Sequence, residues 1–199
     1  GLEPFGSCRV CTVTANGRPC SACTQPIAPG MIVENDTDKL QDYRRTLVEM
    51  MFVEGNHFCM FCEKSGNCEL QAMAYRLGIA VPRFEFLFPH REVDASHPDI
   101  LVDHNRGILC GRCVRTSRDV DGKQVFDFVG RGPHKRVTVR SGTRLADSDA
   151  DVSDAAVDAC PVGALLKKRV GYAVPVGSRK YDQDPIGCDI ESHNASEGY

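Results

Sequence analysis

The sequence predicts an α+β fold made of small successive units, and three observations lead to that prediction. Short β-type runs separated by turn signals fill residues 1–36. Apolar residues then recur at helical spacing from residue 36 to about residue 54, and again from residue 68 to residue 78. Two further strand candidates and one helix candidate follow between residues 124 and 160. We find no internal repeat, so these units differ from one another.

Local signals set the expected bounds of these elements. Asn16-Gly17 lies between two β-type runs and predicts a hairpin, and "MIVEND" is a further strand candidate. Asp36 or Thr37 is the expected cap of the first helix, and the second helix, "CELQAMAYRLG", stops at Gly78. An extended, proline-bounded connector then leads to the strand candidates "QVFDFVG" and "KRVTVRSG" and the helix candidate "DVSDAAVDAC". We expect the Gly- and Pro-rich segment after residue 172 to wrap a neighbour or to be poorly ordered.

Charge and hydropathy exclude two classes of partner. The chain has 199 residues, a net charge of −3 and a pI of about 6.1. It has no polybasic footprint, so we expect no nucleic-acid partner. No apolar run approaches the ~18 residues of a membrane span, and no signal peptide is visible. The chain opens without Met, so we expect a processed or incomplete N-terminus.

Cysteine usage is the strongest functional signal. Eleven cysteines is a high and odd number for a chain without a secretory signal, and disulfides are rare in the cytosol. Their close spacing therefore favours metal binding over disulfide bridges. The groups are Cys8, Cys11, Cys20 and Cys23; Cys59, Cys62 and Cys68; Cys110 and Cys113 with the distant Cys160; and the lone Cys188.

The first group leaves two ligand sets open. The stretch "GSCRVCTV" followed by a strand resembles the [2Fe–2S] loop of β-grasp ferredoxin domains. That resemblance makes Cys8, Cys11 and Cys23 ligands, with a fourth cysteine expected upstream of Gly1. The alternative uses all four cysteines as two C-x-x-C knuckles, as in zinc ribbons and rubredoxins. The later groups favour the first interpretation, which leaves Cys20 a non-ligand.

The second group adds a histidine to three cysteines. His57, Cys59, Cys62 and Cys68 follow the pattern H-x-C-x-x-C-x5-C. Four soft donors from one short stretch can hold either a zinc ion or a cubane cluster.

The third group lacks one expected ligand. Cys110 and Cys113 form a C-x-x-C pair, and the remote Cys160, followed by Pro, closes a pattern typical of cubane clusters. Gly107 stands where a fourth cysteine is expected. The cluster can be a three-iron one, Asp103 or His104 can replace the missing thiolate, or the site can be weak or empty. We rank a cluster with three cysteine ligands first, with a structural dithiol or zinc pair as the alternative.

The order of these motifs resembles a known family. A GxCRxC segment, a long helix, a His/Cys3 run and a CxxC…CP unit follow one another. This order is similar to the N-terminal iron–sulfur region of the complex I large iron–sulfur subunit and of iron-only hydrogenases. It most resembles the small diaphorase subunit of cytoplasmic NAD-reducing [NiFe] hydrogenases, through "FVEGNHFCMFCEKSGNCELQA", "CPVGALLKKRVGY" and "PVGSRKYD". Complex I usually spaces its histidine as H-x3-C, whereas His57-x-Cys59 fits the diaphorase branch.

The resemblance implies a domain order and a set of cofactors. Residues 1–36 would form a β-grasp [2Fe–2S] ferredoxin-like domain and residues 37–80 a small helical His/Cys3 cluster domain. Residues 81–172 would form a ferredoxin-like [4Fe–4S] α+β domain, followed by a tail at 173–199. The implied cofactors are one [2Fe–2S] cluster, one His/Cys3-ligated [4Fe–4S] cluster and one further [4Fe–4S] or [3Fe–4S] cluster.

The resemblance also implies a function. The chain would be a cytoplasmic electron-transfer subunit of an oxidoreductase, with no active site of its own. It would relay single electrons between a flavin- and NAD-binding diaphorase large subunit and the small and large [NiFe] hydrogenase subunits (H2 + NAD+ = NADH + H+). The alternatives are the iron–sulfur module of an NAD-linked formate dehydrogenase or of complex I, and a zinc-stapled scaffold without redox function.

Overall fold

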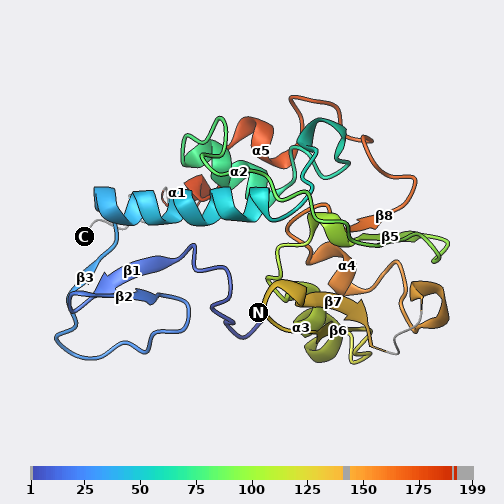
Figure 1. The fold of residues 1–199 in the computed structure, drawn as a ribbon, viewed down its shortest axis with the longest axis horizontal. Helices are drawn as coiled ribbons and strands as arrows, with labels where there is room; N and C mark the ends of the chain where they lie inside the picture. The colour runs from blue at the N-terminus through green and yellow to red at the C-terminus, as the bar shows by residue number, and fades with distance from the viewer. Residues whose placement is uncertain (1, 141–143, 190, 192–199) are drawn as a thin grey trace.

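The computed structural model describes residues 2–140, 144–189 and 191 (Figure 1). The long helix α1 (Asp38–Val53) runs along one side of the molecule, with a small sheet beneath it. A second group of strands and short helices lies beyond the C-terminal end of α1. This mixture of helices and strands agrees with the predicted α+β class.

The small sheet forms the predicted hairpin and one further strand. Strands β1 (Thr12–Ala15), β2 (Arg18–Ser21) and β3 (Val33–Glu34) are antiparallel, in the order β2-β1-β3. Asn16 and Gly17 both have positive φ, 48° and 77°, as a two-residue turn of the favoured hairpin type requires. The hairpin and the strand in "MIVEND" are therefore confirmed.

Helices α1 and α2 (Glu69–Arg76) begin and end where capping chemistry predicts. The Thr37 side chain accepts a hydrogen bond from the backbone N–H of Leu40 at 3.3 Å, so Thr37 is the cap of α1. Cys68 is the N-cap of α2. Gly78, with φ of 67°, supplies the left-handed residue that ends the second helix. Both predicted helices are confirmed.

The remaining strands form two small antiparallel sheets. Strands β4 (Val93–Asp94), β5 (Ile100–Asp103) and β8 (Leu165–Lys167) pair in the order β4-β5-β8. Strands β6 (Phe126–Val129) and β7 (Arg136–Val139) pair with each other and confirm both strand candidates. Residues 141 and 142 of "KRVTVRSG" lie outside the described residues. Strands β5 and β8 were not predicted.

Two helices differ from the expectation. Helix α3 (Arg112–Asp119) was not predicted because its sequence, RCVRTSRD, carries no apolar stripe. Its inward face instead uses the buried Ser117, whose hydroxyl accepts a hydrogen bond from the Val125 N–H at 2.8 Å. Helix α4 (Ala155–Asp158) is shorter than "DVSDAAVDAC" suggests. The Asp151 carboxylate accepts the backbone N–H of Ser153 at 2.8 Å, and this Asx turn delays the helix start.

The C-terminal segment packs against its own chain. In its helix α5 (Lys180–Gln183), the Tyr181 N–H donates to the Gly66 carbonyl at 2.9 Å. The Tyr172 hydroxyl donates to the Phe61 carbonyl at 2.5 Å. The described part of this tail therefore packs against the loop of residues 59–68 of its own chain, and the expectation that it also wraps a neighbour stays a prediction. Residues 190 and 192–199 of the tail lie outside the described part.

One apolar core joins helices α1 to α4 to strands β5 to β8 and reaches two of the cysteine groups. It includes Val48 of α1, Leu70 of α2 and Ile100 of β5, together with Cys68 and Cys160. Burial of such side chains holds the loops that carry the cysteines in fixed relative positions. Among the described residues, no helix has the length and apolar content needed to span a membrane.

Candidate metal centres

The first site consists of Cys8, Cys11 and Cys23, which the structure brings together. A hydrogen bond with the Cys11 thiol is the main reason that the pKa of Cys23 is raised, and Cys8 adds a smaller electrostatic effect. A hydrogen bond from the Gly6 backbone to Cys23 acts the other way. Gly6 has φ of 68°, and a Cβ there would meet the Thr24 methyl at 3.2 Å. Glycine thus lets a backbone N–H approach sulfur, a contact that tunes iron–sulfur centres.

Cys20, the fourth cysteine of the first group, lies apart from Cys8, Cys11 and Cys23. Cys20 stands opposite Val13 in the hairpin of β1 and β2. One groove is lined by Cys8, Cys11 and Cys23 but not by Cys20. This placement favours the three-cysteine ligand set over the two-knuckle zinc set.

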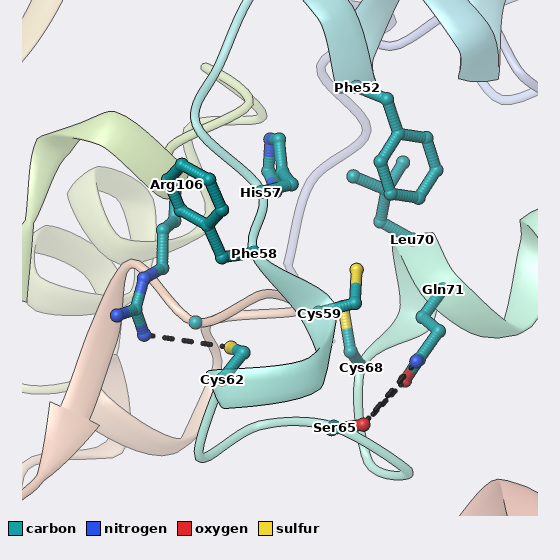
Figure 2. A pocket seen from close by; sticks show the side chains of 11 residues that line it. Phe52, His57, Phe58, Cys59, Cys62, Ser65, Cys68, Leu70, Gln71 and Arg106 are labelled. Atoms are coloured by element: carbon teal, nitrogen blue, oxygen red, sulfur yellow. Dashed lines mark hydrogen bonds between the residues drawn. The ribbon is translucent and has the colours of Figure 1, made fainter. Parts of the chain in front are cut away.

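One cavity brings together the four residues of the second site, His57, Cys59, Cys62 and Cys68 (Figure 2). Cys59 begins the 3₁₀ turn η1 (Cys59–Phe61), Cys62 is the C-cap of that turn, and Cys68 is the N-cap of α2. Local backbone structure therefore fixes all three cysteines. Two apolar side chains, Phe52 and Leu70, line the same cavity and limit its contact with water.

His57 has the properties of a metal ligand. Its Nε2 atom is buried and has no hydrogen-bond partner among the described residues, which is costly for a polar atom unless something binds it. Burial lowers the pKa of His57 to about 4, against the opposing effect of a hydrogen bond with the Met51 backbone. The imidazole is therefore neutral near pH 7, as metal ligation requires. The Phe52 ring packs edge-on at 5.5 Å between ring centroids and holds the imidazole in place.

The burial of the thiols at the second site is also consistent with binding of a positively charged metal centre. Burial raises the pKa of Cys59 and raises that of Cys68 to about 12. These thiols would stay protonated near pH 7 unless a positive charge compensated the thiolates. A bound iron–sulfide core would supply that charge, and its binding would release the protons.

The third site consists of Cys110, Cys113 and Cys160, and its residues also line one cavity. Burial raises the pKa of all three thiols. The backbone curls around Cys110, since Leu109 and Gly111 have φ of 53° and 69°. A left-handed conformation is uncommon for leucine and is typical of strained functional loops.

Gly107 lines the cavity of the third site, and a cysteine would fit there. Its φ and ψ are −78° and 129°, and a Cβ would meet only the His104 carbonyl at 3.6 Å and the Ala164 Cβ at 3.9 Å. Of the two suggested substitutes, His104 lines this cavity. The Asp103 carboxylate is held instead by the Arg106 guanidinium at 2.8 Å. Asp103 is thus engaged by Arg106, and His104 stays the candidate donor that could replace a thiolate.

The third site contacts both of the others. Cys110 lines the same groove as Cys8, Cys11 and Cys23, so the first and third sites are neighbours. On the other side, the Glu69 N–H, next to Cys68, donates to the Pro161 carbonyl at 2.8 Å. The three sites thus lie close together although they are far apart in the sequence.

The described residues form neither a disulfide bridge nor a site for a single metal ion. All eleven cysteines lie within the described residues, and each is a free thiol. In the described ranges, no three His, Cys, Asp or Glu side chains converge as a single metal ion would need.

Sequence reasoning missed two residues that shape the second site. The Arg106 guanidinium donates to the Cys62 sulfur at 3.6 Å (Figure 2). A Cβ at Gly163 would meet the same sulfur at 2.5 Å, so glycine leaves the space that Cys62 occupies. Both belong to segments that carry the third site, and no local pattern connects them with Cys62.

Three family models match successive parts of the chain. Residues 1–38 match a 2Fe-2S iron-sulfur cluster binding domain. Residues 44–83 match the iron-sulfur binding region of NADH-ubiquinone oxidoreductase-G, and residues 97–166 match the ferredoxin-like domain of NADH-quinone oxidoreductase subunit 3. Each match contains one of the three sites.

Relatives in sequence and structure agree with these models. The chain is 44% identical over 179 residues to the gamma subunit of the NAD-reducing hydrogenase HoxS of Cupriavidus necator, covering 89% of this chain and 76% of the relative. It is 33% identical over 176 residues to the mitochondrial 78 kDa subunit of NADH-ubiquinone oxidoreductase of Candida albicans, covering 86% of this chain but 24% of that protein. A chain in a crystal structure of an NAD+-reducing [NiFe]-hydrogenase in the H2-reduced state matches with a TM-score of 0.88 and 47% identity, covering 92% of this chain and 78% of that one.

Proposed function

This chain belongs to the family of the gamma subunit of NAD-reducing hydrogenase, and on that premise we propose that it conducts single electrons within such a complex. The observation that carries the proposal is that one chain forms three sets of sulfur donors, with the third set next to each of the other two. When bound, iron–sulfur clusters supply one-electron chemistry over a wide range of potentials. The chain positions their ligands and buries Cys62, Cys68 and Cys160 among them.

The proposed ligands follow the three sites. We assign a [2Fe–2S] cluster to Cys8, Cys11 and Cys23, and a His/Cys3 [4Fe–4S] cluster to the second site. A further cluster, [4Fe–4S] or [3Fe–4S], belongs to the three cysteines of the third site. The domain division at residues 36, 80 and 172 and the β-grasp arrangement of the first domain belong to the same proposal.

The partners follow from the chemistry that this chain lacks. A two-electron hydride must be divided into single electrons before iron–sulfur centres can carry them, and flavins do this. We therefore propose a flavin- and NAD-binding diaphorase subunit at one end and the [NiFe] hydrogenase subunits at the other, in the cytoplasm. The reaction of the whole complex would be H2 + NAD+ = NADH + H+, with no active site in this chain alone.

The hydrogenase complex is a better candidate than the related ones. Identity to the HoxS relative is 44%, against 32% to the alpha subunit of the NADPH-Fe(3+) oxidoreductase of Geobacter sulfurreducens and 33% to the mitochondrial 78 kDa relative. The chain spans only about a quarter of the latter two proteins, 23% and 24%. The spacing His57-x-Cys59 points in the same direction.

An inventory of the purified complex tests the proposal. We expect iron and acid-labile sulfide in amounts that fit one two-iron and two cubane-type clusters per chain, together with H2-dependent NAD+ reduction. EPR should resolve separate two-iron and four-iron signals. Colourless protein with stoichiometric zinc would instead establish the non-redox scaffold. Iron–sulfur centres with formate-dependent or quinone-dependent turnover would transfer the assignment to another NAD-linked complex.

A further inference from the structure

We propose that Arg106 sets the reduction potential of the second site, although it belongs to the segment of the third. Arg106 ends the 3₁₀ turn η2 (His104–Arg106) and directly precedes Gly107. Its Nη1 donates to the Cys62 sulfur at 3.6 Å, within the range of hydrogen bonds to sulfur (Figure 2). This inference rests on the proposed function, because it concerns a cluster held by the second site.

Two carboxylates hold the guanidinium in its place. The Arg106 Nη1 atom is 2.8 Å from Glu63 Oε2, and its Nε atom is 2.8 Å from Asp103 Oδ2. The Arg106 side chain is only 18% exposed, and that of Asp103 is 10% exposed. The rigid, planar fork of arginine can serve these acceptors and the sulfur together, which a lysine ammonium on a flexible stem does less well.

The surrounding backbone leaves the space that this contact needs. A Cβ at Gly163 would meet the Cys62 sulfur at 2.5 Å, and the Arg106 Cδ and Nη1 atoms at 3.3 and 3.4 Å. Any larger residue would therefore separate the sulfur from the guanidinium. Gly163 and Arg106 both come from third-site segments, so those segments build part of the environment of the second site.

The contact between Arg106 and Cys62 would change the reduction potential of a cluster at the second site through its positive charge. Reduction by one electron, delivered through the partner subunit of the proposed function, adds one negative charge to the centre. An N–H donor on a ligand sulfur and a nearby positive charge both stabilise that added charge, and the low dielectric of a buried site strengthens them. Arg106 therefore raises the potential of the second site, whereas the negative charge of Glu63 lowers it.

The test is an EPR-monitored redox titration of the assembled complex. The second-site signal is identified as the one that His57→Ala alters. We expect Arg106→Gln to lower the equilibrium constant for reduction about tenfold, or about 59 mV for one electron. Arg106→Lys should shift it less in the same direction, and Glu63→Gln should shift it upward. Arg118→Gln, which removes an exposed charge paired with Asp119, is the matched control and should leave the potential unchanged.

The outcomes separate this inference from the proposed function. If the wild-type complex shows the four-iron signal and Arg106→Gln moves its potential no more than Arg118→Gln does, Arg106 has only a structural part. The same conclusion follows if Glu63→Gln and Arg106→Gln shift the potential in the same direction. If Arg106→Gln fails to assemble, the opposite signs expected for Arg106→Lys and Glu63→Gln still decide. Absence of any iron–sulfur signal from the wild-type complex would overturn both proposals.

Discussion

Restoring a thiol at position 107 is the sharpest test of how the third site is built. Gly107 lines the same cavity as Cys110, Cys113 and Cys160. Its φ and ψ of −78° and 129° are open to any L-residue, and a Cβ would make only ordinary contacts at 3.6 and 3.9 Å. Gly107→Cys should therefore fold without strain.

The expected magnitudes follow from this geometry. Replacing glycine at a compatible position stabilises a protein by about 0.4–1 kcal/mol, because the unfolded chain loses freedom. The protein should thus be no less stable than the wild type. With a fourth thiolate, the third site should change from a three-thiolate centre to an ordinary four-thiolate cubane. If the wild-type centre is a three-iron cluster, iron analysis should show one further iron per chain.

Mössbauer and EPR spectra of the assembled complex provide the measurement. Gly107→Ala is the matched control, since it shares the backbone effect but adds no donor, and its third-site spectrum should equal that of the wild type. His104→Ala tests the alternative donor: if His104 ligates, its loss should change the third-site spectrum while Gly107 is still present. A wild-type third site that is already a four-thiolate cubane, unaltered by Gly107→Cys, would refute the interpretation of position 107.

Substitutions at three further places in the structure test the other assignments and the core. His57→Ala should change the EPR signature or potential of one four-iron centre and leave the two-iron signal as it is; an unchanged spectrum would count against ligation. Cys23→Ser should abolish the two-iron signal whereas Cys20→Ser should preserve it, and loss of the signal in both variants would favour the two-knuckle set. Ile100 is fully buried. Ile100→Ala should therefore lower the free energy of unfolding by about 2–5 kcal/mol, and Ile100→Val by about 0.5–1.5 kcal/mol. Denaturant unfolding followed by circular dichroism measures this, and equal losses would show that the core adapts around the cavity.

Short-range patterns predicted the local elements and grouped the donors. Thr37 caps the long helix because a side-chain hydroxyl satisfies a free N–H, and Asn16-Gly17 turns the hairpin because both residues adopt positive φ. Cys59, Cys62 and Cys68 come together because a 3₁₀ turn and a helix start fix their positions. Each of these features depends on chemistry within a few residues.

Long-range relations were beyond that reasoning. Arg106 contacts Cys62 only because the core packs two distant segments against each other, and neither residue's neighbours indicate it. Helix α3 is polar and is held by hydrogen bonds such as that of Ser117, so it carries no periodic apolar signal. The tail offered no apolar pattern either, since much of its docking uses backbone groups, such as the Tyr181 N–H on the Gly66 carbonyl.

The spatial relation of the sites gives the missing thiolate its importance. In the sequence the third site comes last, which suggests that a defect there affects only one end of the proposed relay. In the structure Cys110 neighbours Cys8, and the Cys160 segment supports the second site through Pro161 and Gly163. The third site therefore lies next to both others, and under the proposed function its completeness would bear on electron transfer along the whole chain. Under the proposed function, Gly107→Cys should alter the rate of H2-dependent NAD+ reduction as well as the spectrum of one centre.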